Sequence, residues 1–274
     1  MYHKITNRKL NLLALIIIYL AIICEACDRS IFIECADTTK KLSDKELLII
    51  LPGLGGGGGE RRKIRRFFQN RGYDVYIADY ISRKSVEESV ENLKKGINDI
   101  RANEYNKVHF FTYIMGSWTL NLYLQKYKLT NLSTIVYDRS PLQERAPGIA
   151  AENLKVLSRI LLGKVVKDLA QIDYPPVNKK GIRIGLIIEN RATPLMRLFK
   201  KKTLQMGSIY WEVDSLHQEY NDYYYTWLNH DQMYDKVDIV GNEVLHFISH
   251  GAFSPKARKR VYEGDPFKKY REKQ

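Results

Sequence analysis

Cysteine, proline and glycine are all scarce in this sequence: its 274 residues include only 3, 8 and 17 of them. So few cysteines exclude a small domain held together by disulfides. Few glycines and prolines, beside 45% hydrophobic residues, exclude collagen-like, low-complexity and disordered chains. There is no zinc-finger spacing, aromatic RNA-binding motif or basic recognition helix, so we expect no nucleic-acid partner. The remaining length suits one large domain or two small ones.

Much of the net charge of +13 lies at the two ends of the chain, with +3 in residues 1–9 and +5 in residues 256–274. Residues 1–27 have the order of an export signal, because the basic start is followed by an apolar run from Leu12 to Cys24. That run of 13 residues is shorter than the roughly 20 needed to span a bilayer. We expect residues 254–274 to form a basic tail, either holding anionic lipid head groups or simply solvated.

Cys24 and Cys27 lie where a bacterial lipoprotein carries its lipid, in a stretch that resembles a lipobox. Three alternatives stay open: a lipoprotein, a plain signal peptide, and an uncleaved anchor. All three export the chain, so we expect it to be membrane-anchored, periplasmic or extracellular, with a membrane surface as a partner.

Short apolar runs that alternate with amphipathic stretches predict an α/β domain over residues 28–253. Continuous apolar runs are typical of strands buried on both faces of a parallel sheet. Their alternation with helices predicts a doubly wound, mostly parallel sheet. An unusually long connection after the strand at 132–138 predicts a short helical insertion at about 141–178. Strands are expected at 47–53, 73–80, 108–113, 132–138, 182–188 and 208–213, and helices at 61–71, 86–102, 115–127, 150–162, 164–172 and 237–249.

Two strand-end loops carry a resemblance to a known family. LPGLGG at 51–56 and VHFFTYIMGS at 108–117 resemble the α/β-hydrolase superfamily, whose members read PGLGG or HGLGG and then a nucleophile elbow, G-x-S-x-G. The resemblance covers residues 46–250 and implies that fold, with esterase, lipase or thioesterase activity where the site is intact. The glycines at 55–59 match neither a P-loop nor a dinucleotide motif. We expect no cofactor and no metal.

The elbow departs from the family at its central position, where Ile114 replaces the nucleophile. Isoleucine has no nucleophilic atom, and a β-branched residue tolerates positive φ poorly. We therefore expect either a relaxed elbow or a backbone outlier at Ile114. Ser117, expected to face away from the turn, and Ser140 are the other nucleophile candidates. The oxyanion hole needs only backbone N–H groups, by analogy those of Leu54 and Met115.

The resemblance implies a histidine after the last strand, and His230 in WLNHDQMY has that context, with His217 as a weaker alternative. Thr193 stands where the family commonly has its acid. Asp138 is the first remaining candidate, unless it pairs with Arg139 or caps a helix, and Glu189 is the second.

Other features are given structural interpretations. His109, in an expected strand, and His246 and His250, in the last expected helix, are interpreted as structural. The aromatic run at 220–227 is expected to pack a loop onto the sheet, with a cleft wall or a membrane contact as alternatives.

Two function hypotheses follow. The favoured one is a non-catalytic member, a pseudo-hydrolase that binds a small acyl or carboxylate ligand or a partner, because both nucleophile and usual acid are missing. The alternative is an active esterase, lipase or thioesterase that uses His230 with a relocated nucleophile or without a covalent intermediate.

Overall fold

The computed structural model describes residues 33–34, 37–53, 58–139, 164–171, 175–177, 180–205, 213 and 218–268. The chain divides into two units, residues 1–31 and 32–274. The first unit lies outside the described residues, and with it the expected export signal, Cys24 and Cys27. The described structure belongs to the second unit.

A mostly parallel sheet forms the centre of this unit. Its described strands follow the order β1-β3-β2-β4-β5-β6-β7, and only β1 runs antiparallel to its neighbour, β3. The expected α/β class with a mostly parallel sheet is therefore confirmed. The strands are β1 (Ile33–Glu34), β2 (Glu46–Leu51), β3 (Asp74–Ile77), β4 (Lys107–Thr112), β5 (Leu132–Arg139), β6 (Arg183–Glu189) and β7 (Asp222–Thr226).

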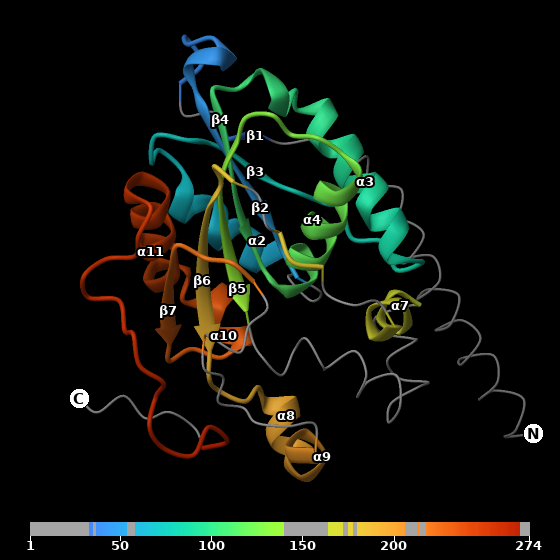
Figure 1. The fold of residues 1–274 in the computed structure, drawn as a ribbon, viewed down its shortest axis with the longest axis vertical. Helices are drawn as coiled ribbons and strands as arrows, with labels where there is room; N and C mark the ends of the chain where they lie inside the picture. The colour runs from blue at the N-terminus through green and yellow to red at the C-terminus, as the bar shows by residue number, and fades with distance from the viewer. Residues whose placement is uncertain are drawn as a thin grey trace, which may run out of the picture. The chain divides into compact units, whose positions relative to one another are not determined.

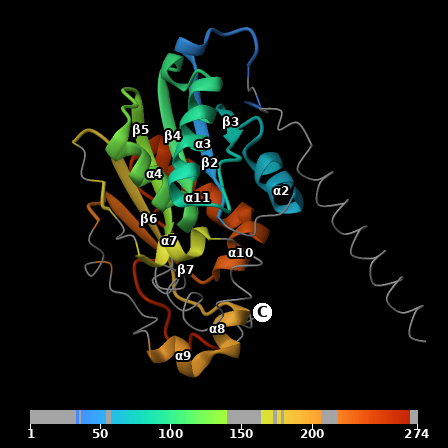
Figure 2. The same cartoon turned by 90° about the vertical axis from the view of Figure 1, so that its right-hand side faces the viewer.

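Helices cover both faces of the sheet, with α3 and α4 on one face and α2, α10 and α11 on the other (Figures 1 and 2). Side chains of β2 alternate between the two layers, as the period of a strand requires. Leu47 and Ile49 pack with the α3 side, and Leu48 and Ile50 with the α2 and α11 side. The helices are α2 (Gly58–Phe68), α3 (Val86–Asp99), α4 (Ile114–Lys126), α7 (Val165–Gln171), α8 (Pro194–Leu198), α9 (Lys200–Gln205), α10 (His230–Asp235) and α11 (Val237–His250), with 3-10 turns at Leu42–Asp44 and Ala102–Glu104.

The expected strand at 208–213 and the aromatic run after it need a correction. Residues 208–212 lie outside the described part of the chain, and Val213 is not in a strand. The last strand among the described residues is β7, inside the run that was expected to form a packed loop. Tyrosines favour strands, and Tyr224 and Tyr225 bury their rings on opposite faces of the sheet. The expected helix at 150–162 and most of the insertion lie outside the described residues.

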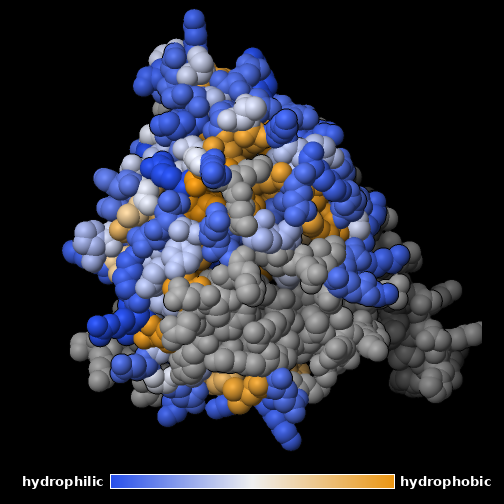
Figure 3. Space-filling model, in the orientation of Figure 1, coloured by the Kyte–Doolittle hydropathy of each residue, from blue (hydrophilic) through white to orange (hydrophobic). Residues whose placement is uncertain are grey.

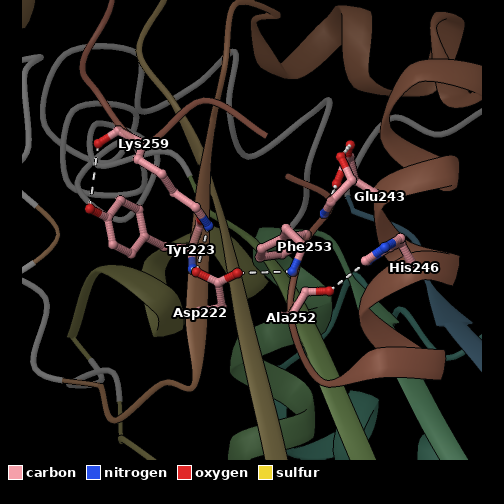
Figure 4. A network of polar contacts seen from close by, with 8 residues as sticks. Asp222, Tyr223, Glu243, His246, Ala252, Phe253 and Lys259 are labelled. Carbon is pink, nitrogen blue, oxygen red and sulfur yellow. Dashed lines mark hydrogen bonds and ion pairs between the residues drawn. The ribbon is translucent and has the colours of Figure 1, made fainter. Parts of the chain in front are cut away.

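Part of the expected basic tail packs against β7 (Figure 4). Lys259 Nζ lies 2.5 Å from Asp222 Oδ1, and the Phe253 amide donates to Asp222 Oδ2 at 2.9 Å. The Tyr225 amide donates to the Arg258 carbonyl at 2.8 Å, so this segment gives the edge strand hydrogen-bond partners. The described part of the tail is therefore held on the sheet at Arg258 and Lys259 rather than simply solvated.

No helix within the described ranges is long and apolar enough to cross a membrane.

Candidate functional site

Polar side chains meet where β5 and β6 end. Asp138 and Glu189 lie near the carboxyl ends of these two neighbouring parallel strands, the edge at which ligands gather in open α/β sheets. His230 follows β7 as the first residue of α10. Asn229 fixes the start of α10 through a capping box with Gln232, since each side chain accepts from the other residue's backbone N–H.

His230 contacts both candidate acids. Its Nδ1 lies 3.1 Å from Glu189 Oε1 and 3.9 Å from Asp138 Oδ2. Both carboxyl side chains are 0% exposed, and the imidazole is 13% exposed. The structure therefore brings His230 together with both acids that the sequence offered. The second candidate, Glu189, is within hydrogen-bond distance, whereas Asp138 is further away.

Burial dominates the electrostatics of this group. It raises the pKa of Asp138 well above its usual range, and the charge of Glu189 adds to that effect. It also raises the pKa of Glu189 to about 8, while the neighbouring Asp138 carboxyl opposes this rise. Burial lowers the pKa of His230, which favours the neutral imidazole. With its proton on Nδ1 facing Glu189, the ring would leave Nε2 as an acceptor.

Two tyrosines build the wall beside His230. The rings of Tyr113 and Tyr234 stack at 4.2 Å, and His230 meets both edge-on at 6.3 and 5.9 Å. The Tyr234 hydroxyl accepts a 2.7 Å hydrogen bond from the Gly53 amide. A Cβ at Gly53 would lie 2.8 Å from that hydroxyl, so only glycine allows so close an approach. These tyrosines were not singled out from the sequence, although Tyr234 follows His230 by one helical turn.

The turn at Ile114 is relaxed. Ile114 is the first residue of α4, and Asn70 and Arg101 are the only described non-glycine residues with positive φ. The expectation of a relaxed elbow or an outlier is thus met by the relaxed form. Gly116 keeps the close packing of a strand–helix elbow, because a Cβ there would lie 2.5 Å from the Leu51 carbonyl oxygen.

Ser117 faces away from the site, as expected. Its Oγ donates to the Tyr113 carbonyl at 3.2 Å and lies 2.8 Å from Thr112 Oγ1. The side chain is 1% exposed, so it is buried and already bonded. Ser140 and His217 lie outside the described residues, as does Leu54 of the expected oxyanion loop.

Met115 lies in the first turn of α4, where backbone N–H groups have no intrahelical acceptor. The N-cap residue, Tyr113, provides no side-chain cap. These amides can therefore donate to a ligand oxygen.

The remaining candidates have structural roles. His109 is buried in β4, with its Nε2 3.1 Å from Glu46 Oε2, and His246 and His250 lie on α11. Thr193, at the family's acid position, accepts a 3.3 Å bond from the Met196 amide at the start of α8. Asn190 was not singled out, yet it is 1% exposed and neither polar atom of its side chain has a partner.

The chain resembles known proteins in its three-dimensional structure but not in its sequence. No family model and no curated protein matches the chain. Bacillus licheniformis lipase BlEst2 is 16% identical with a TM-score of 0.48, and the match covers 64% of this chain and 78% of that one. Est1E from Butyrivibrio proteoclasticus is 11% identical with a TM-score of 0.47, covering 82% and 96%. A thermophilic esterase from Thermogutta terrifontis is 8% identical with a TM-score of 0.45, covering 77% and 92%. Such likeness carries no information on activity.

Proposed function

We propose that this chain, which has the α/β-hydrolase fold, binds a small acyl or carboxylate ligand without forming an acyl-enzyme. The observation that carries the proposal is Ile114 at the relaxed turn into α4. Acyl transfer at an elbow needs a nucleophilic oxygen or sulfur there, and Ser117 is turned into the protein.

The ligand chemistry follows from the groups that remain. Amides of the first turn of α4 can donate to a carbonyl or carboxylate oxygen. His230 is partly exposed, and with its ring proton on Nε2 it can donate a hydrogen bond to such an oxygen.

The missing nucleophile is tested with a fluorophosphonate probe and short nitrophenyl esters on the full chain. The wild type should be neither labelled nor active, and Ile114→Ser should become labelled at the new serine. In that background, His230→Ala should abolish the labelling and Ser117→Ala should leave it intact. Labelling of a wild-type serine that depends on His230 would overturn the proposal.

Binding is tested by titrating the protein with butyrate and octanoate while following backbone amide resonances. We expect shifts at Met115 and its neighbours, and weaker binding in His230→Ala. Binding that leaves the first turn of α4 unshifted contradicts this location of the site.

The contact between His230 and Glu189 favours a second candidate function, general-base catalysis without a covalent intermediate. Ester turnover that resists fluorophosphonate yet disappears in His230→Ala would support it over the first. Turnover blocked by the probe would instead point to a relocated nucleophile.

We further propose that the protein is exported and associates with a membrane, on the strength of residues 1–27. Two exposed leucines on α8 and α9 support this, since Leu198 is 76% and Leu204 50% exposed. Lys200 and Lys201, between them, are also exposed. Apolar atoms show at the lower edge of Figure 3, where Figure 1 places these helices. Leucines flanked by lysines suit an anionic lipid surface.

Vesicle sedimentation tests the membrane proposal. The protein should pellet with vesicles of phosphatidylglycerol and phosphatidylcholine more than with phosphatidylcholine alone, and Leu198→Ser with Leu204→Ser should reduce pelleting. If the wild type and the double variant pellet equally, these leucines do not contribute to membrane binding. The mass of the mature chain distinguishes cleavage, lipidation and retention of residues 1–27.

A further inference from the structure

Three groups that bind metal ions converge from three elements of the fold. Asp138 comes from β5, Glu189 from β6 and His230 from α10. One ligand atom of each can be chosen so that all three lie within 4.8 Å of one another. Sequence spacing could not show this group, because its members are far apart in the chain and meet only at the sheet edge.

Within the described part of the chain, the two carboxyl groups have no lysine or arginine partner. Across the described ranges, the only basic group within ion-pair distance of either is His230. Both oxygens of Asp138 and Oε2 of Glu189 are buried without a hydrogen-bond partner. Unpartnered carboxylate oxygens that face each other in the interior are costly. A proton or a cation between them would remove that cost.

We propose that Asp138, Glu189 and His230 bind a divalent cation of the zinc or manganese class. An imidazole nitrogen with two carboxylate oxygens suits these ions better than Ca²⁺ or Mg²⁺, which take mainly oxygen ligands. Tetrahedral bonds of about 2.0–2.2 Å place ligand atoms about 3.4 Å apart, and His230 Nδ1 already lies 3.1 and 3.9 Å from one oxygen of each acid. The three atoms therefore need little movement to close around it.

The ion would fix the tautomer of His230. Coordination through Nδ1 requires the ring proton on Nε2, which would then donate toward the exposed side of the ring. The inference needs neither a ligand nor a reaction, so it stands apart from the proposed function.

Calorimetry on the chelator-treated full chain tests the site, with Zn²⁺, Mn²⁺, Mg²⁺ and Ca²⁺ added separately. We expect one Zn²⁺ or Mn²⁺ per chain and a concentration-dependent rise in Tm. Asp138→Asn and Glu189→Gln, which keep side-chain size, should each weaken binding by about tenfold or more. Zn²⁺ also binds thiols, so Cys24→Ser, Cys27→Ser and Cys35→Ser are combined as the background.

Two matched controls should bind as the wild type does. Glu46→Gln changes the carboxyl of another His–Glu contact of the same length, 3.1 Å. His250→Asn removes a possible zinc ligand on α11, where the rings of His246 and His250 stack at 4.3 Å.

Either of two results would overturn the inference. One is binding that survives both Asp138→Asn and Glu189→Gln, or that is lost in a control. The other is an infrared band of a protonated buried carboxyl, absent in Asp138→Asn or Glu189→Gln, that persists at saturating Zn²⁺ and Mn²⁺. If the variants fail to fold, anomalous scattering from wild-type crystals soaked in Mn²⁺ decides the matter by placing the ion among the three side chains or elsewhere.

Discussion

Acidic side chains lie at both ends of the parallel strands, but their neighbours differ. At the amino ends, Asp74 is 1% exposed, and Lys45 Nζ and the Tyr105 hydroxyl each donate to it at 3.0 Å. Glu46 has Lys107 Nζ at 2.7 Å and His109 Nε2 at 3.1 Å. These acids lie beside basic or hydroxyl groups that partner them.

At the carboxyl ends, Asp138 and Glu189 face each other and His230, and burial raises the pKa values of both acids. Acidic residues therefore stabilise the amino end of the sheet through their partners, whereas at the carboxyl end their burial without such partners costs stability. Strongly perturbed carboxyl groups are enriched at functional sites, which is why we propose that the ligand binds at this end. The stability lost at the carboxyl end is offset by ion pairs and side-chain packing in the rest of the domain.

The largest expected difference is between two equivalent substitutions. Asp74→Asn should lower the free energy of unfolding by about 3–5 kcal/mol, because it leaves Lys45 buried beside a neutral group. Asp138→Asn in chelator-treated buffer should change it by less than about 1 kcal/mol, or raise it, because a neutral amide replaces an uncompensated acid. Urea denaturation of both variants measures this, and equal losses would remove the contrast between the two ends.

Lowering the pH should destabilise the folded state through His109, which lies at the amino end of the sheet. Burial lowers the pKa of its ring to about 4, with Lys107 and Arg183 also lowering it and Glu46 opposing. Between pH 6.5 and about pH 4, this ring is protonated in the unfolded chain and neutral in the folded chain. The folded state therefore loses about 3 kcal/mol as the pH falls through that window, and the contribution is fully present above it. The pH dependence of urea unfolding should flatten in His109→Gln. An unchanged slope would mean that the ring titrates normally.

A smaller effect is expected at the carboxyl end, where tight packing rather than charge holds α4 to β2. Gly116→Ala should cost about 1–3 kcal/mol, because the new Cβ would meet the Leu51 carbonyl at 2.5 Å and force a shift. Gly72→Ala is unsuitable as a control since φ there is 92°, but Gly58→Ala has its nearest neighbour at 3.6 Å and should cost little. Similar losses at both sites would argue against close packing at the elbow.

The smallest effect concerns a pair at the amino end that is open to solvent. Lys107 is 48% exposed where it meets Glu46. Lys107→Ala should change the free energy of unfolding by less than about 1 kcal/mol and lose even that at high salt. If Lys107→Ala lost as much free energy of unfolding as Asp74→Asn, solvent exposure would not explain the difference between the Lys107–Glu46 and Lys45–Asp74 pairs.

The strands of the sheet core could be predicted because their apolar runs are local and continuous. β7 was missed because a run of tyrosines suits a packed loop, a cleft wall or a strand equally well. Only pairing with β6 makes it a strand, and that pairing is not local. The context of His230 was likewise visible in the sequence, whereas its nearer partner, Glu189, ranked behind Asp138.

The sequence by itself determined that position 114 offers no nucleophile, because isoleucine lacks a reactive atom in any conformation. It also determined the α/β class, since periodicity and run length belong to short segments. The tertiary structure alone decided that Asp138, Glu189 and His230 meet, and that Ser117 bonds inward to Tyr113. The physical reason is that strand order and register set which strand ends lie side by side, and that order depends on the whole sheet.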